Sequence, residues 1–282
     1  MKKNKLSGIY FKSAPTLLEK QIYESFFSEI GPGDLPSLVG EKKNVKGIIV
    51  PHHDYQHSAP CSAWAYKSLV ESGETDLFII IGQSQKGSGI TVEPFETPLG
   101  KVRVHQKLAL KLIAKKNIKE NNPLFEDDEF IESQLPFLQF LYGKNKTITI
   151  LPLLIDENIN YRELVVDLKE SLIDLGLKAK IIVPTRFTSH GRNYNYLPYS
   201  ADVNKKVYEL DRGAIDKILE GNYNDYLKYV EENDMNTNNF LGIVFALIFT
   251  KPKKALLEQY YTTADVDKDF KNFVSFAAIT LE

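Results

Sequence analysis

The residues best suited to chemistry lie in one short stretch, where three of the five histidines of the chain follow one another closely. An apolar run over residues 47–51 ends at Pro51, and His52, His53 and His57 come directly after it. Histidine is the most common protein ligand of transition metals, and it exchanges protons near neutral pH. This stretch therefore predicts a site at the end of a strand, for either a metal ion or a polar ligand.

Two further loops carry polar side chains that can join these histidines. One covers residues 83–89 and follows the apolar run 77–81, and the other covers residues 184–196 and follows the run 180–183. Loops at the carboxyl ends of parallel strands meet at one edge of a sheet. We therefore expect one ligand-binding pocket, with these candidate residues: His52, His53, Tyr55, Ser84, Gln85, Glu132, Arg186 and His190.

The same spacing leaves a metal site open. The candidate metal ligands are His52, His57 and His190, with a carboxylate from Asp54, Glu129 or Glu132. Adjacent side chains of an extended segment point to opposite sides, so His52 and His53 are not expected to share one ion. A plainer interpretation is that His53 and Asp54 form a turn bonded to the backbone, and that His57 only packs against or caps the next helix.

The elements that must position these residues alternate between strand and helix. Nearly continuous apolar runs predict buried strands at 45–51, 77–81, 147–155 and 180–183, with closing strands at 254–263 and 273–281. Helical patterns occur at 16–27, 58–72, 105–115, 131–142, 162–175, 200–220, 223–231 and 238–250. We expect Asn236, Asn238 and Asn239 to cap the last of these helices. Short strands around 97–100 make the sheet mixed.

This alternation predicts an α/β fold with a central mixed, largely parallel sheet flanked by helices. We expect a single domain over residues 1–282, with residues 1–44 as an N-terminal extension packed on it. A chain of 282 residues is long enough to bury a large core.

Composition excludes several classes of protein. The formal net charge is −2, which gives no general attraction to nucleic acid or to an anionic membrane. The single cysteine, Cys61, excludes a disulfide framework within the chain and a cysteine-based zinc site. The basic N-terminus has no apolar segment behind it, and no window is long and apolar enough to span a bilayer. We expect a cytoplasmic protein.

Several motifs, taken in order, resemble those of the Memo family, also called AmmeMemoRadiSam system protein B. They are Pro51-His52-x-x-Tyr55, Phe95-Glu-Thr-Pro-Leu-Gly100, Ile131-Glu-x-Gln-Leu-Pro-Phe137 and Val274-Ser-Phe-Ala-Ala278. In the first of them the family has Pro-His-Ala-Gly-Tyr. The resemblance runs from about residue 45 to the C-terminus. It implies the fold of the class III extradiol dioxygenases and a bound iron or copper ion.

The chain departs from these motifs where the resemblance implies chemistry. Gln85 stands at the family's second histidine, Arg186 at its aspartate, Ser189 at a later histidine and Asn236 at its cysteine, and the family's Glu-His pair is Asp128-Glu129. Only His52 remains of the implied ligands. Metal sites of this kind use two or three protein ligands, and the permanent charge of Arg186 opposes a cation. The sequence therefore predicts a degenerate metal site and no cofactor.

Two functions remain open. In the first, the chain is a non-catalytic binding or accessory protein whose Arg186, His52 and His190 hold a small polar or anionic ligand. The resemblance implies a radical-SAM protein or an AMMECR1-like protein as its partner. In the second, it is a metal-dependent oxidoreductase with a relocated ligand set around His52, which would bind iron, copper or zinc.

Overall fold

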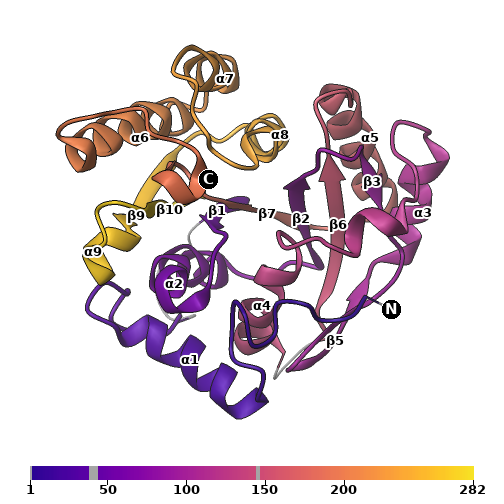
Figure 1. Cartoon of the computed structure of the whole chain (residues 1–282). Coiled ribbons are helices and arrows are strands. Elements are labelled where there is room, and N and C mark those ends of the chain that lie inside the picture. The colour runs from indigo at the N-terminus through magenta and orange to yellow at the C-terminus, as the bar shows by residue number, and fades with distance from the viewer. Residues whose placement is uncertain (1, 38–43, 144–146) are drawn as a thin grey trace.

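A computed structural model describes residues 2–37, 44–143 and 147–282 (Figure 1). Its centre is a ten-stranded sheet in the order β4-β5-β6-β2-β7-β1-β10-β8, with β3 paired to β6 and β9 paired to β10. The strands are β1 (Gly47–Pro51), β2 (Leu77–Gln83), β3 (Gly89–Ile90), β4 (Phe95–Thr97), β5 (Gly100–Val104), β6 (Thr149–Ile155), β7 (Ala179–Thr185), β8 (Ser189–His190), β9 (Ala255–Thr262) and β10 (Phe273–Leu281). The expected α/β class is confirmed.

The middle of the sheet is parallel. Strands β5, β6, β2, β7 and β1 run in the same direction, whereas β10 is antiparallel to β1 and to β9. Every residue of β1 is buried, and β2 is buried as far as Gly82. Such continuous burial explains the nearly unbroken apolar sequences of these strands, because both faces of the sheet are covered.

Helices cover the sheet from two sides (Figure 1). On one side α2 contacts β1 and β10, and α1 packs against α2 and α4. On the other side α8 contacts β7 and β2, and α5 and α7 pack against α8. The helices are α1 (Pro15–Phe27), α2 (Tyr55–Glu71), α3 (Gln106–Ala114), α4 (Leu135–Tyr142), α5 (Tyr161–Leu175), α6 (Val203–Leu219), α7 (Tyr223–Glu232), α8 (Phe240–Thr250) and α9 (Thr263–Asp267). Within the described ranges, no helix is long and apolar enough to cross a membrane.

The described part of the N-terminal extension is packed on the domain. Lys2 N donates to Pro94 O at 2.9 Å, and Leu6 N donates to Glu132 Oε1 at 2.7 Å. The side chains of Leu6 and Phe11 belong to the main hydrophobic core. Residues 1 and 38–43 of the expected extension lie outside the described residues.

Helix boundaries near the site differ slightly from the expectation. The helix expected over 58–72 begins at Tyr55, because the Asp54 carboxylate accepts a hydrogen bond from His57 N at 3.2 Å and so starts the helix three residues earlier. The two-residue strand β8 and the short helix α9 were not expected. Elements this short have too few residues to show a hydrophobic period.

Candidate binding pocket at the carboxyl ends of the strands

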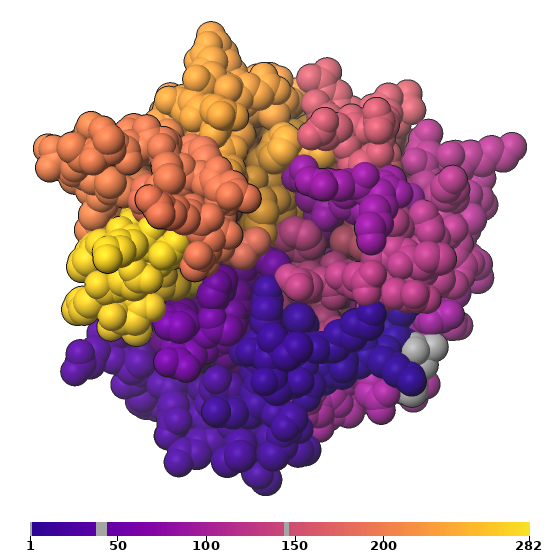
Figure 2. Space-filling view, in the orientation of Figure 1, coloured from indigo at the N-terminus to yellow at the C-terminus, as the bar shows by residue number. Residues whose placement is uncertain are grey.

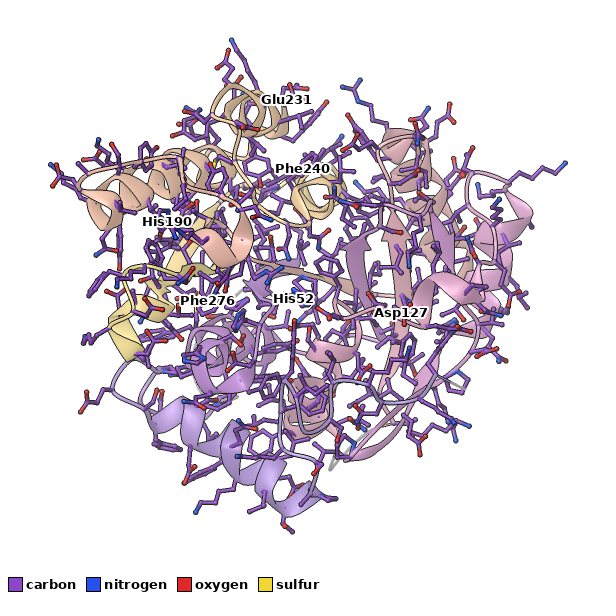
Figure 3. All side chains as sticks on the ribbon, viewed as in Figure 1. His52, Asp127, His190, Glu231, Phe240 and Phe276 are labelled. Atoms are coloured by element: carbon purple, nitrogen blue, oxygen red, sulfur yellow. The ribbon has the colours of Figure 1, made fainter. Side chains whose placement is uncertain are left out.

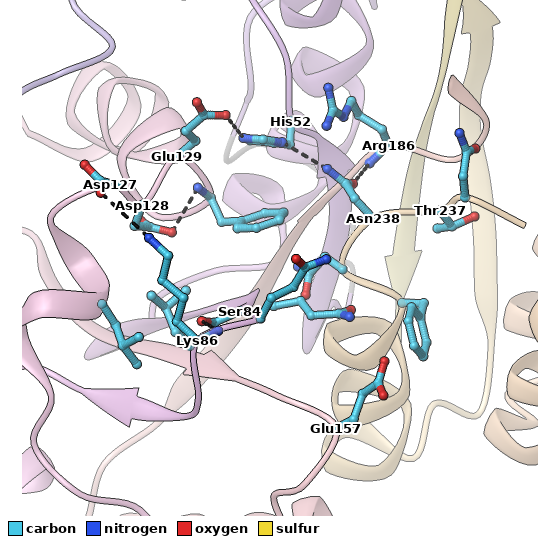
Figure 4. A pocket seen from close by; sticks show the side chains of 18 residues that line it. His52, Ser84, Lys86, Asp127, Asp128, Glu129, Glu157, Arg186, Thr237 and Asn238 are labelled. Atoms are coloured by element: carbon cyan, nitrogen blue, oxygen red, sulfur yellow. Dashed lines mark hydrogen bonds and ion pairs between the residues drawn. The ribbon is translucent and has the colours of Figure 1, made fainter. Parts of the chain in front are cut away.

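A pocket of about 600 Å³ lies at the carboxyl ends of the parallel strands (Figure 4). The face of the molecule seen in Figure 2 is hollowed near its centre, between orange residues and the purple and magenta ones. The pocket lining comes from the ends of β1, β2, β6 and β7, from residues 127–130 and from the segment before α8. The lining residues are His52, Gln83, Ser84, Gln85, Lys86, Leu124, Asp127, Asp128, Glu129, Phe130, Leu154, Glu157, Arg186, Asn236, Thr237, Asn238, Asn239 and Phe240.

Strand register places His52 beside Arg186. Pro51, the last residue of β1, is the parallel partner of Thr185, the last residue of β7. The ladder continues by one bond, in which His52 N donates to Thr185 O at 3.0 Å. The next residue of each strand therefore enters the same pocket, as the convergence of strand ends predicts.

His52 is held in one orientation by three neighbours. Its side chain is 2% exposed, and its ring stacks on Phe130 at 4.6 Å between centroids. Asn238 Nδ2 lies 3.4 Å from His52 Nδ1, and Glu129 Oε2 lies 3.7 Å from His52 Nε2. The amide donates to Nδ1, so the ring proton belongs on Nε2, facing the carboxylate. Burial first, and then the charge of Arg186, hold the pKa of His52 well below its usual value, so the ring is neutral.

Phe130 can reach His52 because β2 has a glycine near its end. A Cβ atom on Gly82 would lie 2.8 Å from Phe130 Cβ and 2.8 Å from Leu154 Cδ2. Both distances are too short for carbon atoms in contact. The missing side chain of Gly82 thus gives Phe130 the space from which it stacks on His52.

Arg186 brings a positive charge into the pocket. Its backbone N–H donates to Asn238 Oδ1 at 2.5 Å, but its Nε is buried and makes no hydrogen bond. Among the described residues, no carboxylate lies within 4.0 Å of its guanidinium nitrogens, and Asp54, Glu129 and Glu132 contact other groups. A buried donor without an acceptor is costly.

The segment before α8 is fixed to the sheet by an asparagine. Asn239 Nδ2 donates to Ile81 O at 2.8 Å and to Pro184 O at 2.7 Å, and so ties α8 to β2 and β7. The expectation that this side chain caps the helix is wrong, because Asn239 makes no capping bond. The bond to two strands presents Thr237 and Asn238 to the pocket. Thr237 Oγ1 is also buried without a partner.

Acidic residues form the opposite wall (Figure 4). Glu129 Oε2 accepts a hydrogen bond from Tyr10 OH at 2.8 Å. Asp128 accepts from the backbone N–H groups of Phe130 and Ile131. Lys86 is 4.0 Å from Asp127 at the rim. The pocket therefore has one cationic end at Arg186 and one acidic end.

Four of the eight expected pocket residues line this pocket: His52, Ser84, Gln85 and Arg186. The other four, His53, Tyr55, Glu132 and His190, do not. Tyr55 OH donates to Ser133 O at 2.6 Å inside the core, and Glu132 is engaged with Leu6. His190 lies on β8 against Phe273, with 5.0 Å between the ring centroids, and Figure 3 places it towards α6, apart from His52.

The candidate metal ligands His52, His57 and His190 are not brought together either. In the described ranges, His53, Asp54 and His57 make up the group of three or more metal-ligating side chains whose ligand atoms lie within 4.8 Å of one another. The polar groups next to His52 are the amide of Asn238, 3.4 Å from Nδ1, and the carboxylate of Glu129, 3.7 Å from Nε2, and the Arg186 guanidinium lines the same pocket. One imidazole and one carboxylate beside a fixed positive charge do not match the three protein ligands that catalytic zinc and non-haem iron sites use.

Several lining residues were not expected from the sequence. Lys86, Asp127, Glu157, Thr237 and Asn238 all reach the pocket. Asn238 carried a partial signal, since it stands two residues after the position of the family's cysteine. The others lie on loops whose course depends on tertiary contacts, and their residue types alone gave no signal.

Fold and site together define a single-domain α/β protein of the dioxygenase-like type, with its pocket at the carboxyl ends of parallel strands. The family model described as "Memo-like protein" matches residues 2–280, and the chain belongs to this family. Similar proteins include MEMO1 family proteins of Sulfolobus acidocaldarius and Methanopyrus kandleri, each 29% identical, and one of Saccharolobus solfataricus, 30% identical. Each comparison covers 97% of this chain and 96% of the relative.

Proposed function

We propose that this Memo-family protein is a non-catalytic binding or accessory protein. Its pocket would hold a small polar or anionic ligand between Arg186, His52 and the amides of Asn236 and Asn238. In this proposal no metal ion binds at the position of the family's metal, where the side chains offer one histidine and a fixed positive charge.

The observation that carries the proposal is the Arg186 guanidinium, which has no ion-pair partner in the part of the chain that the structure describes. It lines the pocket beside His52, its Nε has no acceptor, and Thr237 Oγ1 nearby also lacks a partner. An acceptor group on a ligand would satisfy the guanidinium. The acidic wall limits how much negative charge such a ligand can carry, so an acid that also has a donor group, such as an amino acid, matches both ends.

The test is a binding screen on the full-length protein with small carboxylic, amino and phosphorylated acids, followed by calorimetry. We expect Arg186→Gln to weaken the best ligand by roughly 10- to 100-fold, since a hydrogen bond to a charged group contributes about 1.5–3 kcal/mol. Arg192→Gln, which changes an exposed arginine, is the matched control and should bind normally.

Metal analysis of untagged protein gives the contrary outcome. Stoichiometric iron, copper or zinc that is lost in His52→Ala would contradict the proposal. It would favour the second candidate, a metal-dependent oxidoreductase, for which the nearness of Glu129 to His52 is the supporting contact.

The accessory role is tested separately, by co-purification with a radical-SAM protein and an AMMECR1-like protein encoded nearby in the genome. We propose these as first partners because the family name joins the three proteins. Failure to bind either would remove the accessory role while leaving ligand binding in place.

A further inference from the structure

Outside the pocket, three potential ligand side chains meet at the start of α2. His53 Nδ1 lies 2.5 Å from Asp54 Oδ2, and His57 Nδ1 lies 2.9 Å from Asp54 Oδ1. The ligand atoms of the three residues all lie within 4.8 Å of one another. Two imidazoles thus contact one carboxylate, and His57 Nδ1 also lies 3.0 Å from Asp54 Oδ2.

Local backbone structure builds this arrangement. Asp54 is the N-cap residue of α2 and accepts from His57 N, so the side chains of Asp54 and His57 must lie on the same side of the first helical turn. His53 precedes the cap and completes the group. In the family's motif, the positions of His53 and Asp54 are alanine and glycine, which offer no ligand atoms.

We propose that His53, Asp54 and His57 bind a divalent transition-metal ion, with zinc as the best match. Two neutral imidazoles and a carboxylate are a common ligand set for such ions, and solvent can supply the fourth position. Bonds of about 2.0–2.1 Å in tetrahedral geometry separate ligand atoms by roughly 3.3 Å. The distances of 2.5 and 2.9 Å from the two imidazoles to Asp54 must therefore lengthen when an ion binds.

Two contacts support this assignment. His53 Nδ1 is buried and lies 2.5 Å from Asp54 Oδ2, so an ion that replaces the proton between them would be held by both atoms. Asp267 Oδ2 faces the other ring nitrogen of His57, 3.7 Å from Nε2. A carboxylate at that position can hold the ring proton on Nε2 once an ion replaces the hydrogen bond between His57 Nδ1 and Asp54.

The charges around the group also favour a cation. Two carboxylates, those of Asp54 and Asp267, lie within 4.0 Å of the ring nitrogens of His57. Negative charge on both sides of the imidazole attracts a divalent ion. The three side chains are each partly exposed, so an ion can enter from solvent. His52 points into the pocket instead, and the two sites are separate.

The experiment measures Zn²⁺ and Co²⁺ binding to metal-free full-length protein by calorimetry and by the visible spectrum of the cobalt form. We expect one ion per chain. His53→Ala and His57→Ala should each weaken binding by at least about tenfold, and Asp267→Asn by about tenfold. His52→Gln is the matched control, since it removes the neighbouring histidine from the pocket and should leave ion affinity unchanged.

Neither variant should disturb the start of α2, because asparagine also caps helices in Asp54→Asn, and Asp54 is unchanged in His53→Ala. Circular dichroism checks that both variants are folded. The inference is overturned if wild-type protein binds no ion at roughly 0.1 mM free metal. Equal binding by the His53 and His57 variants would overturn it too. Loss of the ion in His52→Gln alone would overturn both this inference and the ligand proposal, whereas absence of any ion leaves the Arg186 proposal intact.

Discussion

Among the acidic residues that line the pocket, Asp128 is the one buried in the core, with 8% of its surface exposed. Burial raises its pKa to about 7, although the N–H groups of Ile131 and Phe130 act in the opposite direction. The unfolded chain has an ordinary aspartate, which ionises near pH 3.8. Between these values the folded carboxyl keeps its proton and the unfolded one does not, so rising pH favours unfolding.

We predict that Asp128→Asn removes this pH dependence. From about pH 4 to about pH 7 the free energy of unfolding of wild-type protein should fall relative to that of the variant, by up to about 1.4 kcal/mol per pH unit. Urea denaturation at a series of pH values measures the difference. Asp127→Asn, at a largely exposed neighbour, should keep the wild-type slope over the upper part of this range. Parallel curves for wild type and Asp128→Asn would show that the buried carboxyl is already ionised.

At the scale of the elements, the end of β2 controls the orientation of His52 through one absent side chain. Gly82 leaves the space that Phe130 fills, and Phe130 supports the imidazole ring. Gly82, which indirectly positions His52, thus lies on β2, and β7 separates β2 from β1 in the sheet.

Gly82→Ala is predicted to destabilise the fold by about 1–3 kcal/mol, the usual cost of overpacking a core. It should also weaken ligand binding, because Phe130 must move away from His52. Chemical denaturation and the binding assay measure the two effects. In a Phe130→Gly background, which removes the Cβ atom 2.8 Å from the new methyl group, that methyl group should cost less. Equal costs in both backgrounds would mean that Leu154, and not Phe130, is the contact that matters.

The strands were predictable from sequence because burial on both faces demands continuous apolar runs, as in β1, β2 and β7. The meeting of His52, Gln85 and Arg186 was predictable too, since parallel strand ends share one edge. The positions of individual side chains could not be predicted in this way. Glu132 and His190 stand close to the right loops, but hydrogen bonding to the N-terminal segment and packing on Phe273 hold them outside the pocket.

The segment before α8 also shows that side-chain partners could not be predicted from local sequence. A run of asparagines ahead of a helix favours capping on local grounds. Asn239 instead satisfies two carbonyl groups of distant strands, Ile81 O and Pro184 O. Nothing in the local sequence specifies those partners, because they become neighbours only when the sheet has formed.

For the whole molecule, the N-terminal segment is part of the folded domain and not a loose tail. Leu6 is 4% exposed and its backbone holds Glu132, whereas Ile9, three residues later, is 72% exposed. Leu6 and Ile9 therefore allow a buried and an exposed apolar residue of the same segment to be compared by substitution.

Leu6→Ala should lower the free energy of unfolding by about 2–4 kcal/mol, since a buried leucine leaves a cavity. Ile9→Ala should change it by less than about 0.5 kcal/mol, as surface substitutions do. Thermal or urea unfolding measures both. Similar small effects would show that the segment does not pack on the domain in solution.

The position of β1 within the sheet has a consequence for how the protein is made. β1 is paired on one side with β7 and on the other with β10, so that Gly47 lies opposite Leu281. β1 is synthesised before its second neighbour, β10, and residues 52–272 lie between the two strands. Until residues 273–281 have emerged, one edge of β1 remains unpaired and open to wrong partners. The sheet on both sides of β1 is therefore completed only after residues 273–281 have been translated, and chaperones that shield strand edges should matter most during that interval.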